Sequence, residues 1–277
     1  MNDNTGQYMI YNNMIVDASE EISIDTSLGK TAYEVIRIIN GVPLFYEDHY
    51  KRMKDTLTAI GADLEMTAEQ MADNIKTLLK ANKQSICNIM VIVAGQGKDQ
   101  KQLIYIKKAF YPTREEADAG VKTGLFEIER KNPNAKIINQ SYKAAVAKKI
   151  EDGGFYEVLL VDGQGRITEG SRSNAFFVMD GEIWTAPGEA VLKGVTRKYV
   201  IEACRRAGCR MEEQFMDACK ISQAEGAFLS GTSIKVLPIS MVDEKPLNSP
   251  KNSVIAAVKK EYDLILEKYI DGNVNKW

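Results

Sequence analysis

The sequence predicts a two-domain protein that mixes α and β structure, and three observations carry this prediction. The 277 residues, 44% apolar and 27% charged, have the length and composition of a globular chain with one large domain or two moderate ones. The first third combines short strand-like segments, hairpin turns and amphipathic helices. After a charged segment, strands and helices follow one another again. We expect an N-terminal α+β domain at 1–113, a linker at 114–120 and a C-terminal domain at 121–277.

The elements of the first third follow from periodicity and turn residues. Asn12-Asn13 and Asn40-Gly41 tolerate the left-handed backbone that a tight hairpin needs. Thr67 and Gln70 form a capping box that opens a helix. We expect strands within 8–17 (as a hairpin), 31–39, 42–45, 86–94 and 102–110, mostly antiparallel, and helices at 47–60 and 67–81.

The rest of the chain begins after the linker, which is charged and contains Pro112 and Gly120. Gly153-Gly154 and Gly208 are stop signals for two helices. We expect helices at 141–151, 196–207 and 252–269, and strands at 121–130, 157–161, 227–230 and 236–242, together with two strands on either side of a turn within 166–177.

Composition and charge exclude several classes of function. A formal net charge of −2 gives no electrostatic reason to bind nucleic acid or an anionic membrane. No segment approaches the roughly 18 apolar residues that a membrane span needs. The first residues lack the basic start and apolar core of a signal peptide, so we expect a cytoplasmic protein.

The cysteines and the single histidine predict no metal centre. Cys87, Cys204, Cys209 and Cys219 form no CxxC pair and no metal-ligand spacing, and we expect them to be reduced thiols. A Ser-His-Asp triad would depend entirely on His49.

The turn within 166–177 is the strongest candidate for a ligand site. A strand ends at Glu169, a turn of glycine and small hydroxylated residues follows, and a second strand starts near Asn174. Small residues let a backbone approach a ligand closely, and a carboxylate held there is only partly hydrated. The alternative is an ordinary β-turn with an exposed glutamate.

Two further motifs stand in order around this turn. Upstream is Lys136-Ile-Ile-Asn139, and downstream is Val191-Leu-Lys-Gly-Val-Thr-Arg197, a loop that opens a helix. Together, from about residue 21 to 238, they resemble the class IV (fold type IV) pyridoxal-phosphate enzymes, which include branched-chain aminotransferases, D-amino-acid aminotransferases and aminodeoxychorismate lyases. The resemblance implies pyridoxal 5′-phosphate, a homodimer, and a smaller N-terminal domain followed by a larger, cofactor-binding one with a β-barrel-like core.

The resemblance also implies roles at the reacting end of the cofactor. Lys136 would form the Schiff base with the aldehyde, with Lys143 on the next helix as the rival. Glu169 would lie against the ring nitrogen and keep it protonated, because a neighbouring carboxylate favours the charged form.

The phosphate of the cofactor requires donors. A helix start offers backbone N–H groups and a favourable dipole, so Val195 and Thr196 are candidates. Thr232, with Ser233 as its neighbour, resembles the second phosphate-binding turn of the family. Arg52 occupies the arginine position of a family H-x-x-R motif, and a guanidinium suits a phosphate through paired hydrogen bonds. His49 of the same motif is expected to be structural.

The substrate pocket is less well defined. Tyr33 and Arg37 share one face of a strand that resembles the family's [FY]-E-x-[IL]-R segment, where the aromatic residue lines the pocket. Arg37 either binds a substrate carboxylate or pairs with a buried acid, and we favour the second. Ser171 is the third candidate for the substrate pocket, and its neighbours Arg172 and Ser173 are equal alternatives.

The expected reaction moves an amino group between an amino acid and a 2-oxo acid. The residues that hold the substrate carboxylate in D-amino-acid enzymes, and the tyrosine and arginine typical of branched-chain enzymes, are missing at their usual positions. The enzyme is therefore expected to be of branched-chain or D-amino-acid type without a choice between them. The alternatives are 4-amino-4-deoxychorismate lyase and, in another class, a non-catalytic binding protein.

Overall fold

The computed structural model describes residues 3–24, 31–130 and 132–277. These form two compact units. Unit 1 contains Met1–Phe110, Ala135–Ile138 and Leu266–Trp277, and unit 2 contains Tyr111–Asn134 and Asn139–Ile265. The short segment with Lys136 therefore belongs to unit 1, although it follows the predicted linker. The domain boundaries read from the sequence stay a prediction.

Unit 1 is built on an antiparallel sheet with strand order β2-β1-β6-β5-β3-β4. Its strands are β1 (Tyr8–Tyr11), β2 (Met14–Asp17), β3 (Thr31–Ile39), β4 (Val42–Pro43), β5 (Cys87–Ala94) and β6 (Lys101–Lys107). Both predicted hairpin turns are confirmed, because Asn12, Asn13, Asn40 and Gly41 all have positive φ. A short 3₁₀ helix, η1 (Gly97–Asp99), lies between β5 and β6.

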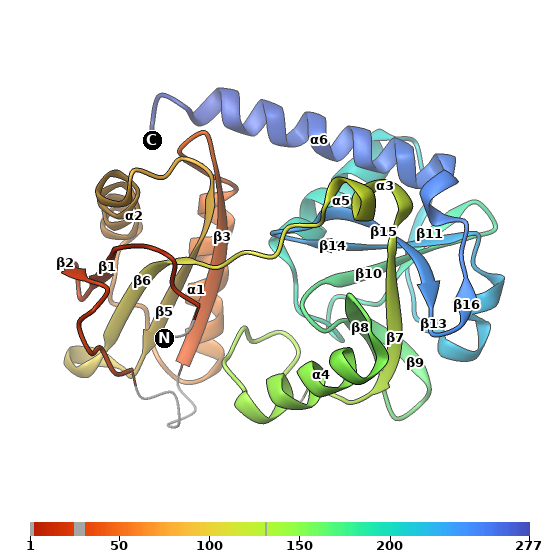
Figure 1. Cartoon of the computed structure of the whole chain (residues 1–277), viewed down its shortest axis with the longest axis horizontal. Coiled ribbons are helices and arrows are strands. Elements are labelled where there is room, and N and C mark those ends of the chain that lie inside the picture. The colour runs from red at the N-terminus through yellow and green to blue at the C-terminus, as the bar shows by residue number, and fades with distance from the viewer. Residues whose placement is uncertain (1–2, 25–30, 131) are drawn as a thin grey trace. The chain divides into compact units, whose positions relative to one another are not determined.

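Two helices cover one face of this sheet, as Figure 1 shows. They are α1 (Tyr46–Ala59) and α2 (Ala68–Asn82), and α2 begins with the predicted capping box of Thr67 and Gln70. Met53 and Leu57 of α1 pack with Ile36 of β3 in the buried cluster beneath them. Alternate residues of β3 therefore face the helices.

The end of the last helix, α6 (Ser253–Asn273), also belongs to unit 1. The Tyr46 amide donates to the hydroxyl of Tyr269 (3.0 Å), which donates to Glu47 (2.8 Å). The Trp277 ring packs edge-on against Tyr46, with 5.0 Å between centroids. These contacts hold the C-terminal segment on the start of α1.

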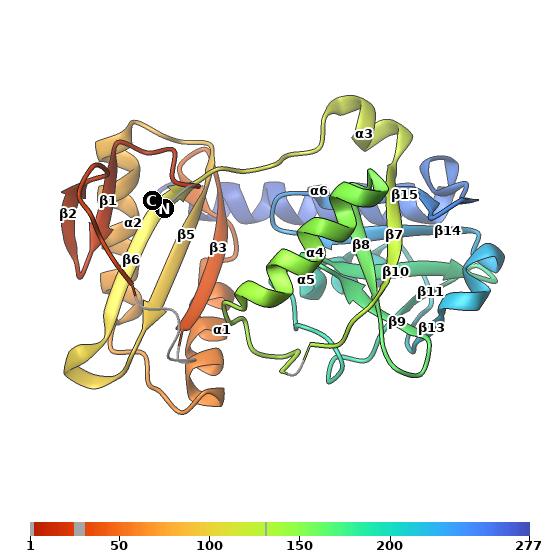
Figure 2. The same cartoon turned by 60° about the horizontal axis from the view of Figure 1, so that its bottom comes forward.

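Unit 2 is built on a ten-stranded sheet that curls, as Figure 2 shows. Its strands are β7 (Val121–Glu127), β8 (Glu157–Val161), β9 (Arg166–Gly170), β10 (Asn174–Met179), β11 (Glu182–Thr185), β12 (Met211–Glu213), β13 (Met216–Asp217), β14 (Gly226–Gly231), β15 (Lys235–Val242) and β16 (Lys245–Pro246). The order is β12-β11-β10-β14-β15-β7-β8-β9-β13, with β16 paired to β15. The β-barrel-like core expected of the larger domain corresponds to this curled sheet.

Helices pack on the outside of the curled sheet. They are α3 (Arg114–Ala119), α4 (Gln140–Gly153), α5 (Val195–Arg206) and the first part of α6, with 3₁₀ turns η2 (Ala218–Gln223) and η3 (Ser249–Lys251). The segment expected as a linker is thus helical, because Thr113 and Glu116 form a capping box. α4 packs on β7 and β8, and α5 on β14. In the described part of the chain, no helix has the length and hydropathy to span a membrane.

The turn after β9 does not close a hairpin. β9 pairs with β8 and β13, whereas β10 pairs with β11 and β14. Residues 170–174 therefore carry the chain from one part of the curled sheet to another. Such a crossing needs its own hydrogen bonds, because the two strands do not supply them.

Candidate active site

A buried glutamate holds the turn between β9 and β10. Oε1 of Glu157 accepts hydrogen bonds from the Arg172 amide (2.6 Å), the Ser173 hydroxyl (3.0 Å) and the Ser171 hydroxyl (3.4 Å). A Cβ on Gly170 would lie 2.3 Å from the Ser173 hydroxyl and 2.7 Å from Glu157, so only glycine fits. Burial raises the pKa of Glu157, against the opposing charge of Arg172 and these hydrogen bonds. Glu157 is not among the site residues predicted from the sequence, although a charged residue opening an apolar strand was a signal.

The predicted ring-binding residue, Glu169, is buried at the end of β9 and is 3% exposed. Its Oε1 accepts from Arg130 Nη1 (2.8 Å). Its Oε2 accepts from the Leu192 amide (3.1 Å) and from Asn174 Nδ2 (3.4 Å). This is no exposed turn glutamate, and its carboxylate has a fixed orientation. Arg130 and Asn174 were not predicted as partners of Glu169, because only the tertiary structure brings them to the carboxylate.

Helix α5 begins next to this carboxylate. Asn174 Nδ2 also donates to the Leu192 carbonyl (2.9 Å), in the loop that precedes the helix. A Cβ on Gly194, the N-cap residue, would lie 2.3 Å from Asn174 Oδ1, so this close approach requires glycine. No side chain caps the helix, and the first-turn residues Val195 and Thr196 are buried. The helix start therefore offers backbone N–H donors of the kind that bind anions.

The end of β14 lies at the same place. Ser230 is paired with Asn174 across the β10–β14 ladder. A Cβ on Gly231 would lie 3.5 Å from the Cβ of Ser173 in the turn. Thr232 follows directly and is half-buried. Unit 2 thus brings together four of the predicted regions: Glu169, the turn with Ser171, the start of α5, and Thr232.

The donors and acceptors gathered in unit 2 fit pyridoxal phosphate. A buried carboxylate suits a protonated ring nitrogen, and an uncapped helix start suits a phosphate. The hydroxyl of Ser230 is buried and has no hydrogen-bond partner among the described residues. Gly170 and Gly194 leave no Cβ in the path of these groups.

Unit 1 positions Lys136 beside β3. The Tyr33 amide donates to the Lys136 carbonyl (3.0 Å), and residues 32 and 137 form an isolated bridge. The Lys136 amine lies 4.6 Å from the centroid of the Tyr33 ring. Lys136 is half-buried, whereas its rival Lys143 is exposed on α4. The environment of Lys136 is therefore the more constrained of the two.

Arg52 lies on α1 and faces a buried acid of β3. Its Nε and Nη2 donate to the two carboxylate oxygens of Glu34 (2.7 and 2.6 Å), and His49 Nδ1 is 2.7 Å from the same group. Burial alone would raise the pKa of Glu34, but the Arg52 charge and the hydrogen bonds from His49 and Arg52 outweigh it and lower this pKa to about 2. Burial lowers the pKa of His49, against the attraction of Glu34. The lowered pKa favours the neutral imidazole, which donates through Nδ1 to the Glu34 carboxylate.

The predicted pocket residues Tyr33 and Arg37 occupy the other face of β3. Burial alternates along this strand, and Tyr33 and Arg37 are half-buried whereas Glu34 is buried. Tyr33 packs with Val35 and Ile92 in the second cluster of unit 1. Arg37 lies opposite Asn88 of β5. The shared face predicted for Tyr33 and Arg37 is confirmed.

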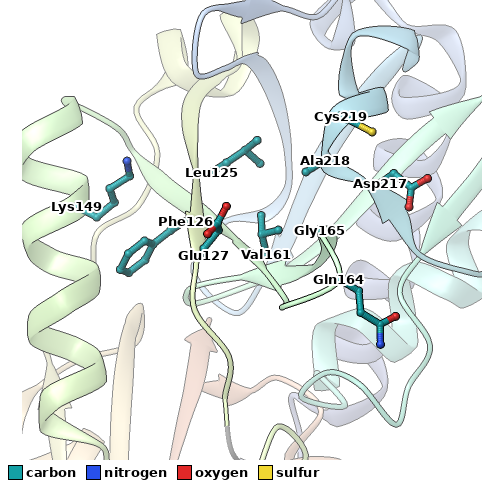
Figure 3. A pocket seen from close by; sticks show the side chains of 10 residues that line it. All are labelled: Leu125, Phe126, Glu127, Lys149, Val161, Gln164, Gly165, Asp217, Ala218 and Cys219. Atoms are coloured by element: carbon teal, nitrogen blue, oxygen red, sulfur yellow. The ribbon is translucent and has the colours of Figure 1, made fainter.

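A separate pocket in unit 2 contains none of the predicted residues. It has a volume of about 560 Å³ and opens beside β7 and the turn between β8 and β9. Figure 3 shows Lys149 of α4, Leu125 of β7 and Asp217 among the residues around it. Neither Glu169 nor any residue at the start of α5 lines this pocket.

Unit 2 has mixed α and β structure, and its candidate site offers donors that suit a phosphate. Comparison with known proteins gives the family of the chain. Residues 31–242 match the amino-transferase class IV family, and the chain belongs to it. D-alanine aminotransferase from Bacillus licheniformis is 23% identical over 256 residues, which cover 87% of this chain and 90% of that one.

Solved structures share the fold. Branched-chain aminotransferase from Thermoproteus uzoniensis superimposes with a TM-score of 0.84 at 22% identity, over 96% of this chain and 98% of that one. The pyridoxal-phosphate form of the branched-chain enzyme from Thermobaculum terrenum gives a TM-score of 0.82 at 21% identity, over 99% and 97%. The chain is therefore a fold type IV transaminase that depends on pyridoxal phosphate. This confirms the predicted cofactor and enzyme class.

Proposed function

We propose that this aminotransferase holds pyridoxal 5′-phosphate through Lys136 and Glu169 and moves an amino group between an aliphatic amino acid and a 2-oxo acid. The observation that carries the proposal is the convergence in unit 2 of the buried Glu169 carboxylate with the uncapped start of α5. These are the two groups that a pyridine nitrogen and a phosphate need, and both come from elements that the sequence motifs marked.

The phosphate is assigned to Val195, Thr196, Thr232 and Arg52. The amides of Val195 and Thr196 supply neutral donors at the positive end of the helix dipole. Thr232 adds a hydroxyl. Arg52 adds a charge, and Glu34 binds its Nε–Nη2 edge, which fixes the plane of the guanidinium. Because the pKa of Glu34 is about 2, this carboxylate stays ionised at neutral pH and keeps the arginine in place.

The proton transfer is assigned to Lys136. When bound, pyridoxal phosphate withdraws electrons from the α-carbon of the attached amino acid. The Lys136 amine would accept the α-proton of the substrate and later return a proton. Glu169 would accept a hydrogen bond from the ring N–H, and its other partners, Arg130 and the Leu192 amide, hold its carboxylate in a fixed orientation.

The substrate is assigned to the aliphatic class. The relatives in the comparisons are named for D-alanine and for branched-chain amino acids, which are both aliphatic. Tyr33 offers an apolar ring 4.6 Å from the Lys136 amine, and Arg37 lies further along the same face. Ser171 is the third pocket residue proposed, although its hydroxyl donates to Glu157 in this structure.

We also propose a cytoplasmic homodimer. Class IV membership supports the dimer, and the edge strand β2 exposes Met14 (63%) and Ile15 (48%), which a second chain can cover. Light scattering should give twice the 30.9 kDa mass of the chain, and a mass of one chain at micromolar concentration contradicts the dimer.

The test of the catalytic assignment compares Lys136→Ala with Lys143→Ala. The wild-type protein, loaded with pyridoxal phosphate, should show a visible absorbance band that fades when L-leucine, L-alanine or D-alanine is added singly. Lys136→Ala should lose the covalent cofactor on borohydride reduction, and its turnover should fall by about three orders of magnitude or more, since the base is removed. Lys143→Ala should keep both.

Three outcomes contradict the proposal in different ways. A wild-type protein that takes up no pyridoxal phosphate overturns the cofactor site as a whole. If Lys136→Ala stays covalently labelled and active, only the lysine assignment is wrong. If charged amino acids such as glutamate bleach the band and aliphatic ones do not, the substrate class is wrong.

A further inference from the structure

The hydroxyl of Ser230 is a buried polar group without a partner. Ser230 is 1% exposed, and no atom of residues 3–24, 31–130 or 132–277 makes a hydrogen bond to its Oγ. A buried hydroxyl that lacks a hydrogen bond is costly relative to one in water. Two other buried hydroxyls in unit 2 are satisfied. Ser249 Oγ accepts from the Ala227 amide (2.9 Å), and Thr185 Oγ1 donates to the Ala175 carbonyl (2.9 Å).

The strand register gives the direction of the Ser230 side chain. Ser230 is opposite Asn174, and Phe228 is opposite Phe176, in the antiparallel β10–β14 ladder. Side chains two residues apart share a face, and the Phe176 and Phe228 rings are stacked with 4.8 Å between centroids. Ser230 and Asn174 are therefore cross-strand neighbours on that same face.

That face holds the start of α5. The Asn174 side chain donates to the Leu192 carbonyl, and its Oδ1 fills the space where a Cβ on Gly194 would be. Gly194 is the N-cap of a twelve-residue helix that no side chain caps. The Ser230 hydroxyl thus faces the site where first-turn amides of α5 lack intrahelical partners.

We propose that Ser230 donates its hydroxyl hydrogen to the cofactor phosphate bound at the start of α5. This inference rests on the proposed function. A phosphate dianion only accepts hydrogen bonds, and both the helix amides and a free hydroxyl donate, so one anion satisfies all of them. The serine then contributes to affinity through the phosphate alone, and it costs stability when the site holds no ligand.

The experiment measures binding of pyridoxamine 5′-phosphate and of pyridoxamine to wild-type and Ser230→Ala proteins by equilibrium dialysis. Pyridoxamine has no aldehyde, so neither ligand forms a bond with Lys136. Loss of a hydrogen bond to a charged group should raise the Kd of pyridoxamine 5′-phosphate about tenfold or more. The Kd of pyridoxamine should stay within twofold, because it lacks the phosphate.

Thermal unfolding gives a second measurement, in which the effect of Ser230→Ala on stability differs between the ligand-free and the ligand-bound protein. Without ligand, Ser230→Ala should unfold at the same or a higher temperature than wild type, since an unpaired buried hydroxyl is removed. With pyridoxamine 5′-phosphate, its gain in midpoint should be smaller than that of wild type. Ser249→Ala is the matched control. It removes a satisfied hydroxyl, and should unfold earlier than wild type in both states while binding pyridoxamine 5′-phosphate normally.

The results distinguish a failure of the role assigned to Ser230 from a failure of the proposed function. An unchanged Kd of pyridoxamine 5′-phosphate in Ser230→Ala, with wild-type binding intact, overturns the role of Ser230 and leaves the proposed function standing. Equal losses for both ligands also overturn it, because they indicate general damage. Ser230→Cys keeps a side chain of similar size with a weaker donor, so its Kd for pyridoxamine 5′-phosphate should lie between the values of wild type and Ser230→Ala. A wild-type protein that binds neither ligand overturns the proposed function together with this inference.

Discussion

Replacing Glu34 with glutamine should destabilise unit 1 by about 3 kcal/mol at pH 7. Glu34 is fully buried and accepts from both Arg52 and His49. Its pKa falls from 4.5 to about 2 on folding, which at about 1.36 kcal/mol per pH unit corresponds to about 3 kcal/mol. Glutamine keeps the shape but removes the charge that Arg52 faces. The loss agrees with the roughly 3–5 kcal/mol for breaking a buried ion pair.

The sign of the pH dependence follows from the lowered pKa. The stabilising contribution is complete above the unfolded value of 4.5 and is lost as the pH falls toward 2, because the unfolded chain then takes up a proton that the folded one refuses. At pH 3.5, one unit below 4.5, about 1 kcal/mol of it is lost. The difference between wild type and Glu34→Gln should therefore shrink by that amount between pH 7 and pH 3.5.

The two tryptophans provide a clean assay. Trp277 packs on Tyr46 in unit 1, and Trp184 lies in β11 of unit 2, so a Trp184→Phe background reports unit 1 alone in urea unfolding. Glu65→Gln, on an exposed glutamate of unit 1, is the control and should change little. The uncertainty of the extrapolated free energy of unfolding is about 0.5 kcal/mol. If the free energy of unfolding of Glu34→Gln lies within this limit of its parent, the reasoning is wrong. A stability difference that does not vary with pH would refute it as well.

Two predictions concern unit 2. Glu157→Gln should be neutral or stabilising at pH 7, because burial raises the pKa of Glu157 and glutamine keeps an oxygen for the three donors of the turn. Any gain in the free energy of unfolding should vanish below pH 4.5, where Glu157 is protonated in both the folded and the unfolded state. Glu157→Leu should cost about 2–4 kcal/mol in urea unfolding, since it leaves those donors unpaired, and equal stability of the two variants contradicts this. Gly194→Ala should weaken the binding of pyridoxamine 5′-phosphate about tenfold or more in dialysis, because the new Cβ displaces Asn174 at a cost of about 1–3 kcal/mol. The control is Gly181→Ala, where no atom lies near the new Cβ, and this variant should bind normally. Normal binding by Gly194→Ala would show that the contact with Asn174 is not needed.

Local patterns predicted the elements well, because their signals lie within a few residues of each other. The β-branched run of β3 ends at the Asn40-Gly41 turn, and the capping box at Thr67 starts α2, as expected. The predicted return strand at 42–45 was too long, since Phe45 instead becomes the N-cap of α1. The segment expected as a linker contains the helix α3, which Thr113 and Glu116 open as a capping box, and its role as a linker stays a prediction.

The interactions that fix the candidate site were not predictable in the same way. Glu34 and Arg52 are 18 residues apart, and Arg130 and Glu169 are 39 apart. Their pairing depends on which face of a strand meets which helix or loop, and no local spacing encodes that. Residue type indicated the candidate ligand-binding groups, whereas their supporting partners became visible only in the fold.

Asn174 shows why the carboxylate and the helix start in unit 2 act together. Its Nδ2 donates to Glu169 and to the Leu192 carbonyl, and the Leu192 amide donates to the same carboxylate oxygen. The turn, the loop and α5 therefore share one small network, in which no member can move alone. A ligand that binds Glu169 at one end and the α5 amides at the other finds both already placed. This lowers the entropy that binding must overcome, and it means that substitutions at the two ends will not be additive, since residues in one hydrogen-bond network are coupled.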